Sequence, residues 1–220
     1  DHTFTGRLTS CLVNPRACHE TELNYLPTEA PKRLAVVGAG PAGLAYATVA
    51  AERGHAVTLF DAGSEIGGQF NLAKQVPGKE EFYETLRYYS RMLKVNHVVV
   101  NLNTTVSAED LKSGGFDHVV VATGITPRTP DIEGIDHPKA ASYIDVIRGN
   151  VEVGKTVAVM GAGGIGFDVS ELIMHKGVSA AMDKEVFARE WGIDFANHPR
   201  GGVTGVVPQV EAADRQVFLL

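Results

Sequence analysis

The stretch Leu34-Ala-Val-Val-Gly-Ala-Gly-Pro-Ala-Gly43 decides the fold, because a short apolar run leads directly into a Gly-x-Gly-x-x-Gly turn. The apolar part predicts a buried strand, and the residues from Leu44 to Arg53 predict a helix after the turn. A second strand is predicted from Ala56 to Phe60, and Asp61 follows it. This order of strand, glycine turn, helix, strand and acidic residue is typical of a dinucleotide-binding unit.

Each fixed residue of the turn has a physical role in such a unit. Gly38 makes the tight turn, Gly40 lets the backbone approach a pyrophosphate, and Gly43 allows the helix to pack closely on the strand. Asp61 is predicted to accept hydrogen bonds from ribose hydroxyls, with the pyrophosphate at the N-terminus of the helix. The alternative is a glycine turn that holds no nucleotide. The predicted binding residues besides Asp61 are Gly38, Ala39, Gly40, Pro41, Ala42 and Gly43.

A second glycine turn, Gly161-Ala-Gly-Gly-Ile-Gly166, follows a strand predicted over Lys155 to Met160. A helix is predicted from Phe167 to about His175, and a turn-rich stretch then leads to a strand-like run from Gln216 to Leu220. In a complete unit the residue after this strand favours NAD when it is acidic and NADP when a base is present. The sequence stops before that residue, so the preference stays open. The predicted binding residues here are Gly161, Gly163, Gly164 and Gly166.

The composition of the chain excludes several classes of protein. Its 220 residues are 44% hydrophobic, include 24 glycines and carry a net charge of −6, which is typical of a globular protein that does not bind nucleic acid. No apolar run reaches the length of a membrane span and Asp1 follows no signal-peptide pattern, so we expect a cytoplasmic protein without a membrane partner. The missing initiator Met and a chain that stops inside a strand predict a piece of a longer polypeptide.

Between the two glycine turns the sequence predicts one helix and two strands. The helix begins at Pro77-Gly78, and the strands lie near His97 to Leu102 and over Phe116 to Ala122, the second ending in Ala-Thr-Gly. Arg87 is expected on a solvated helix face, the alternative being contact with a phosphate. The helix also carries an apolar stripe, predicted to be core rather than part of a cofactor site, formed by Phe82, Leu86, Tyr89 and Leu93.

Further motifs carry a family resemblance. The first glycine turn with Asp61, the run Gly63-Ser-Glu-Ile-Gly-Gly-Gln69, the run Val121-Ala-Thr-Gly124 and the run Pro127-Arg-Thr-Pro-Asp-Ile-Glu-Gly134 together resemble a flavoprotein of the pyridine-nucleotide oxidoreductase type. Longer runs resemble the bacterial NADPH-dependent 2,4-dienoyl-CoA reductases of the trimethylamine dehydrogenase group. These longer runs are Thr9–Glu20, Ile66–Phe70, Val76–Tyr89 and Trp191–Asp194.

The resemblance implies an α/β fold of the Rossmann-like FAD/NAD(P)-binding type, with a parallel sheet and flanking helices. It implies two successive nucleotide-binding units, both incomplete here, with FAD in the first and NADPH in the second. Residues 1–30 would be an irregular linker, residues 31–152 the FAD-binding domain and residues 153–220 the truncated start of the NAD(P)-binding domain. The resemblance adds to the flavin site Gly67, Gly68, Gln69, Val106, Ala122, Thr123 and Gly124.

The resemblance also gives Cys11 a role. By themselves, two cysteines predict no disulfide framework, and the residues alone indicate ordinary thiols at Cys11 and Cys18. In the resembled group an N-terminal barrel carries FMN and the substrate pocket, and four cysteines hold a [4Fe–4S] cluster, the last of them at the position of Cys11. FMN and the cluster are therefore expected only in the full-length protein, where the barrel would bind an acyl-CoA thioester. No catalytic residue is predicted in these 220 residues.

Three functions remain open at this point. The first is the NADPH-to-FAD portion of an enzyme that reduces 2,4-dienoyl-CoA thioesters in the β-oxidation of unsaturated fatty acids. The second is the same module in an amine dehydrogenase or an enoate reductase, which only the barrel would distinguish. The third is an ADP-binding structural module without hydride transfer, against which the intact second glycine turn argues. The sequence predicts no oligomeric state.

Overall fold

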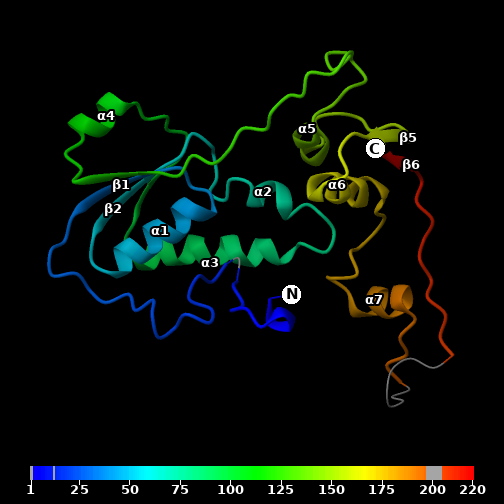
Figure 1. The fold of residues 1–220 in the computed structure, drawn as a ribbon, viewed down its shortest axis with the longest axis horizontal. Helices are drawn as coiled ribbons and strands as arrows, with labels where there is room; N and C mark the ends of the chain where they lie inside the picture. Colours follow the sequence, from blue (N-terminus) through cyan, green and yellow to red (C-terminus); the bar gives the residue numbers. More distant parts are fainter. Residues whose placement is uncertain (1, 12, 197–204) are drawn as a thin grey trace. The chain divides into compact units, whose positions relative to one another are not determined.

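The computed structural model describes residues 2–11, 13–196 and 205–220, and the chain divides into two compact units (Figure 1). The first unit comprises Asp1–Phe70 and Glu84–Thr126, and the second comprises Asn71–Tyr83 and Pro127–Leu220. The polypeptide thus enters the second unit briefly after Phe70, returns to the first, and enters the second again after Thr126.

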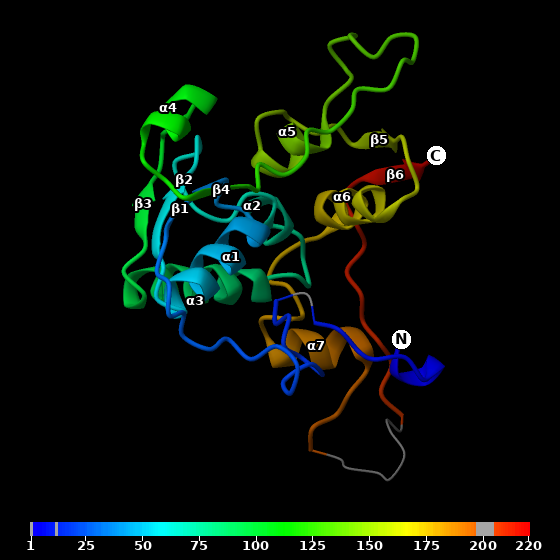
Figure 2. The same cartoon turned by 60° about the vertical axis from the view of Figure 1, so that its left-hand side comes forward.

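The first unit is built on a four-stranded parallel sheet with the strand order β3-β2-β1-β4 (Figure 2). Its strands are β1 (Arg33–Val37), β2 (Ala56–Phe60), β3 (Val99–Asn101) and β4 (His118–Val121). In the register of the sheet, Val37 pairs with both Phe60 and Val121. Because the strands are parallel and end level with one another, Gly38, Asp61 and Ala122 leave the same edge of the sheet side by side.

Two helices cover this sheet and form the core of the unit. Helices α1 (Pro41–Glu52) and α3 (Glu81–Val95, from Glu84 in this unit) run side by side in both views (Figures 1 and 2). The buried cluster joins Leu44 and Ala47 of α1 to Tyr89 and Leu93 of α3 and to the apolar strand residues. Burying these side chains stabilises the unit by about 1.5–3 kcal/mol for each large one. The first unit also contains η1 (Thr3–Thr5) and α4 (Ala108–Ser113), whereas α2 (Phe70–Ala73) begins at its last residue and continues into the second unit.

The second unit contains a two-stranded parallel sheet of β5 (Thr156–Val159) and β6 (Gln216–Leu219). Helix α6 (Gly164–Met174) packs on both strands and contacts α5 (Tyr143–Arg148), as Figure 1 shows. Helix α7 (Lys184–Trp191) follows α6 along the chain. Both units therefore repeat one pattern, a strand that leads through a glycine turn into a helix, and this confirms the predicted α/β fold with parallel sheets and flanking helices.

The structure differs from the predicted elements in several places. Helix α1 begins at Pro41 rather than at Leu44, and the short helices α2, α4 and α5 were not predicted. Helix α6 begins at Gly164 rather than Phe167, and α3 begins at Glu81 because the residues before it form a tight turn in which Lys79 N–H donates to the Val76 carbonyl. Helix α7 lies in the stretch predicted to be turn-rich, of which residues 197–204 lie outside the described residues. Apart from the short η1, the described part of residues 1–30 is irregular, as predicted.

Two smaller predictions can be compared with the structure. Tyr89 and Leu93 are buried and Leu86 packs against them, which confirms a core role for this stripe, while Phe82 is half-buried. Arg87 is exposed and pairs with Glu84 at 2.5 Å, so it lies on a solvated helix face. In the part of the chain that the structure describes, no helix is both long and apolar enough to cross a bilayer.

Candidate nucleotide sites

Backbone contacts with the ends of neighbouring strands fix the conformation of the first glycine turn. Gly38 has φ of +109°, a conformation that side chains rarely adopt, and a Cβ there would clash with the carbonyl oxygen of Ala122 at the end of β4. Its N–H donates to the Phe60 carbonyl at 2.8 Å. A Cβ on Gly43 would clash with the carbonyl oxygen of Gly38. Both glycines are therefore required for the strand, turn and helix to meet, which agrees with the structural roles predicted for them.

Gly40 differs from these two glycines. It has φ of −77° and ψ of −178°, which any residue adopts, and it caps the N-terminus of α1. A Cβ on Gly40 would lie 4.0 Å from Gly68 Cα, an ordinary contact distance. Neither backbone conformation nor packing therefore explains a glycine at this position. Close approach of a ligand to the backbone does explain it, in line with the predicted role.

Asp61 braces the turn from the end of β2. Its Oδ2 accepts a hydrogen bond from Ala39 N–H at 2.6 Å, and its Oδ1 accepts one from Gly63 N–H at 2.7 Å. A carboxylate has about four acceptor positions, so two bonds leave capacity for ribose hydroxyls. Asp61 is half-buried and directly follows β2 at the edge of the sheet. The structure thus gives Asp61 a supporting role that the sequence did not predict, and its role as an acceptor for ribose hydroxyls stays a prediction.

A second loop closes on the same turn. Gly67 has φ of +124° and donates its N–H to the Ala39 carbonyl at 2.7 Å. Gly68 lies against Gly40, where a Cβ on Gly68 would come within 2.9 Å of Gly40 Cα. The predicted residues that the structure brings together are therefore Gly38–Gly43, Asp61, Gly67, Gly68 and Ala122. Gln69, Thr123 and Gly124 are exposed and Val106 is half-buried in the same unit, and their part in binding stays a prediction.

The second glycine turn repeats the construction of the first. Gly161 has φ of +116° and donates its N–H to the Leu220 carbonyl at 2.8 Å. A Cβ on Gly166 would clash with the Gly161 carbonyl oxygen and lie 3.3 Å from Leu219 Cδ1. Gly163 has extended backbone with φ of −88°, and no described atom lies within 4 Å of a Cβ placed there or on Gly164. The position equivalent to Gly40 is again a glycine that packing does not require.

Both turns deliver the N-terminus of a helix to the edge of a parallel sheet. The first backbone N–H groups of α1 and α6 have no partner within their own helix, and the helix dipole places partial positive charge there. Such an end is suited to an anionic group such as a pyrophosphate. Residues 41–44 and 164–167 include no acidic side chain that would compete for this position. Both turns therefore fit a dinucleotide.

Comparison with known proteins agrees with this geometry. Residues 32–193 match the pyridine nucleotide-disulphide oxidoreductase family. The chain belongs to this family. Its domain implies binding of FAD and NAD(P), and its members include flavin-dependent reductases and dehydrogenases.

Individual relatives of the family cover most of the chain. It is 36% identical over 181 residues to a metal reductase of Desulforamulus reducens, covering 80% of this chain and 27% of that protein. It is 36% identical over 197 residues to a cinnamate reductase of Clostridium sporogenes, and the match covers 86% of this chain and 29% of that protein. The structure of a 2-naphthoyl-CoA reductase complex matches with a TM-score of 0.74 and 27% identity, over 99% of this chain and 37% of that one. The chain thus spans less than a third of the length of the two curated reductases.

The family match does not test whether Cys11 is an iron–sulfur ligand. Cys11 and Cys18 are both free and exposed. Within the described residues, no group of three or more His, Cys, Asp or Glu side chains is placed to hold a metal ion. Cys11 is thus a single cysteine, whereas a [4Fe–4S] cluster takes four cysteine ligands. Its role as a cluster ligand stays a prediction.

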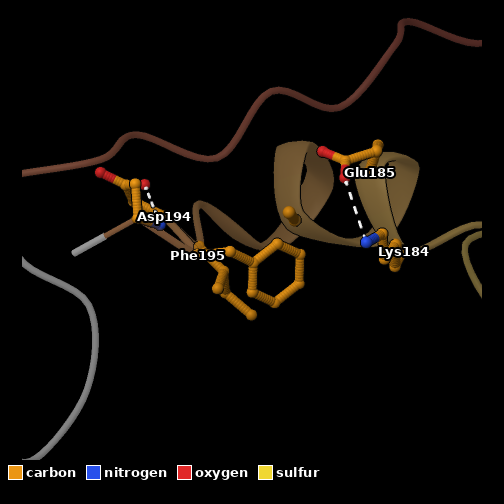
Figure 3. Close-up of a pocket in the computed structure, with 7 residues that line it drawn as sticks. Lys184, Glu185, Asp194 and Phe195 are labelled. Carbon is orange, nitrogen blue, oxygen red and sulfur yellow. Dashed lines mark hydrogen bonds and ion pairs between the residues drawn. The ribbon is translucent and has the colours of Figure 1, made fainter. Parts of the chain in front are cut away.

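One surface hollow lies apart from the predicted nucleotide-binding residues. It has a volume of about 440 Å³ and is formed by α7 and the residues after it (Figure 3). Its charged groups bind their own neighbours: Lys184 Nζ lies 3.9 Å from Glu185 Oε1, and Asp194 Oδ1 accepts from Ala196 N–H at 2.8 Å. The ring of Phe195 lines it between them. None of the predicted nucleotide-binding residues lines this hollow.

Proposed function

We propose that this chain is the part of an oxidoreductase that takes electrons from a reduced nicotinamide nucleotide, with FAD at Gly38–Gly43 and NAD(P)H at Gly161–Gly166. The observation that carries the proposal is the pair Gly40 and Gly163. Both are glycines at the same place in their turns, and neither backbone conformation nor packing requires them. FAD, when bound, accepts a hydride from the nicotinamide and passes its electrons onward.

The residues of the chain would bind and orient the nucleotides. At the first turn the backbone of Gly40 and the N-terminus of α1 would receive the pyrophosphate, while Asp61 would accept from the ribose hydroxyls. The loop at Gly67 and Gly68 would hold the turn in place through the bond from Gly67 N–H to the Ala39 carbonyl. At the second turn Gly163, Gly164 and the N-terminus of α6 would receive the pyrophosphate of the nicotinamide nucleotide. We assign no acid or base in the chain.

We further propose NADPH as the donor and a 2,4-dienoyl-CoA thioester as the final acceptor, bound outside these residues with FMN and an iron–sulfur cluster. The long runs at residues 9–20 and 76–89 support this assignment, as does the similarity to a 2-naphthoyl-CoA reductase, whose named ligand is also a CoA thioester. A second candidate acceptor is a free enoate, which the 36% identity to a cinnamate reductase favours. The amine dehydrogenase alternative differs in the substrate pocket alone.

The test is an anaerobic assay of the protein at its natural length. Flavin reduction would be followed with NADPH and with NADH, and then reoxidation with a 2,4-dienoyl-CoA, cinnamate or a secondary amine. The proposal predicts reduction by NADPH and reoxidation by the dienoyl-CoA. Reoxidation by cinnamate alone would replace the substrate and leave the electron-input role intact. Release of ADP without flavin from the denatured protein would instead show a structural nucleotide and contradict the proposed function.

A further inference from the structure

One ion pair in the second unit lies close to the start of α6. Lys79 Nζ is 2.5 Å from Asp168 Oδ2, and the two side chains are only 38% and 31% exposed. Lys79 belongs to the turn at residues 76–79 that precedes α3, and Asp168 belongs to α6. The two residues are far apart in sequence, and the pair was not predicted from it.

The position of Asp168 on α6 makes its charge relevant to a bound nucleotide. Residues 164–167 are Gly-Ile-Gly-Phe, so Asp168 is the first charged residue of the helix. It lies four residues after Gly164, about 6 Å along the helix axis. Side chains on a helix tilt toward its N-terminus, so the carboxylate leans toward the glycine turn. An unpaired carboxylate there would repel the pyrophosphate that the helix N-terminus attracts.

The same turn has a second attachment that does not involve this charge. Gly78 N–H donates to Ser179 Oγ at 3.3 Å, in the segment that follows α6. Lys79 N–H also donates to the Val76 carbonyl at 3.0 Å within the turn. Because both bonds use backbone N–H groups, substituting the Lys79 side chain leaves them in place. The charge of Lys79 can therefore be removed without removing the turn from α6.

We propose that Lys79 is a positioning residue for the second nucleotide site, which neutralises Asp168 and thereby keeps the N-terminus of α6 receptive to an anionic dinucleotide. This inference rests on the proposed function, because it assumes that NAD(P) binds at Gly161–Gly166. Lys79 acts through Asp168 and need not touch the nucleotide. Its effect should therefore disappear when Asp168 carries no charge.

The experiment compares four proteins of natural length: wild type, Lys79→Met, Asp168→Asn and the double variant. Their affinities for NADP⁺ and NAD⁺ are measured by calorimetry, with FAD content and thermal midpoint as controls for folding. Lys79→Met should weaken binding by about three- to tenfold, the scale of one charge near a helix terminus. Asp168→Asn should bind at least as well as wild type, and the double variant should recover wild-type affinity. Lys79→Arg, which keeps the charge, should bind normally.

The outcomes distinguish neutralisation of the Asp168 charge from mere attachment of the turn at residues 76–79 to α6. If the pair merely holds the turn against α6, Asp168→Asn will lose as much affinity as Lys79→Met and the double variant will not recover, which would overturn the proposal. Unchanged affinity in Lys79→Met would overturn it as well. Raising the salt concentration should reduce the difference in nucleotide affinity between Lys79→Met and wild type, because salt screens partly exposed charges. Failure of the wild type to bind either nucleotide would contradict the proposed function instead.

Discussion

Gly40 and Gly43 belong to one turn, yet the structure requires only Gly43 for folding. A Cβ on Gly43 clashes with the Gly38 carbonyl oxygen, so Gly43→Ala should destabilise the protein by about 1–3 kcal/mol, as overpacking typically does. Gly40→Val should keep a native far-UV circular dichroism spectrum and lose nucleotide binding, because the new side chain fills the space that the pyrophosphate needs. Denaturant unfolding measures the stability of Gly43→Ala, and calorimetry with FAD or ADP measures nucleotide binding by Gly40→Val. Retained binding in Gly40→Val would show that the turn is only a structural elbow.

Asp61 gives a second prediction at the scale of single residues. Asp61→Ala removes the acceptor for ribose hydroxyls together with the bonds from Ala39 and Gly63 N–H. Bonds of this charge-assisted kind contribute about 1.5–3 kcal/mol, so affinity for FAD or ADP should fall at least tenfold. Asp61→Asn is the matched control, because its amide oxygen still accepts a backbone N–H but carries no charge. A folded Asp61→Ala protein with undiminished affinity would remove Asp61 from the binding site.

At the scale of elements, helix α7 depends on its N-cap. Asp183 Oδ1 accepts from Glu185 N–H at 2.8 Å and Val186 N–H at 3.1 Å, and these bonds lower the pKa of Asp183, Val186 contributing most. A carboxyl whose folded pKa is lowered stabilises the helix above its unfolded pKa, about 3.9, and loses that effect as pH falls through the folded value. Trp191, the one tryptophan of the chain, stacks on Phe187 within α7 and reports this change.

The fluorescence of Trp191 should therefore change in acid, with a midpoint below the ordinary aspartate pKa. Asp183→Asn keeps a cap that accepts N–H bonds but cannot titrate, so its fluorescence should not show this step. Asp183→Ala should show a frayed α7 at every pH. An identical acid step in Asp183→Asn would assign the transition to another group.

The predictions from sequence are confirmed where a short apolar run leads into a glycine turn, as at β1 and β5. All six strands that the described residues form were expected, because each is a short run rich in apolar and β-branched residues. The register then brings Gly38, Asp61 and Ala122 to one edge. Helix α7 was missed although Asp183 and Gly192 mark its two ends, since its amphipathic pattern covers only two turns. The Lys79–Asp168 pair could not be predicted, because it joins segments far apart in sequence through tertiary packing alone.

At the scale of the whole molecule, these two relatives are about three times as long as this chain, because 80% and 86% of the chain cover 27% and 29% of them. We predict that residues 1–220 expressed alone hold no stoichiometric iron and do not reduce a dienoyl-CoA thioester with NADPH. A [4Fe–4S] cluster normally takes four cysteine thiolates, and these residues include two. Iron analysis and a spectrophotometric assay check this directly. Stoichiometric iron, or turnover above background, would show a complete module.

The central claim is that one chain receives FAD at its first glycine turn and a nicotinamide nucleotide at its second. The most direct measurement is the visible absorption spectrum of the purified natural-length protein during anaerobic titration with NADPH and, separately, with NADH. The account predicts a bound flavin whose absorption is bleached by the nicotinamide nucleotide, and a Gly163→Val variant that keeps the flavin but is no longer bleached. A colourless protein, or a flavin that neither nucleotide reduces, would contradict it.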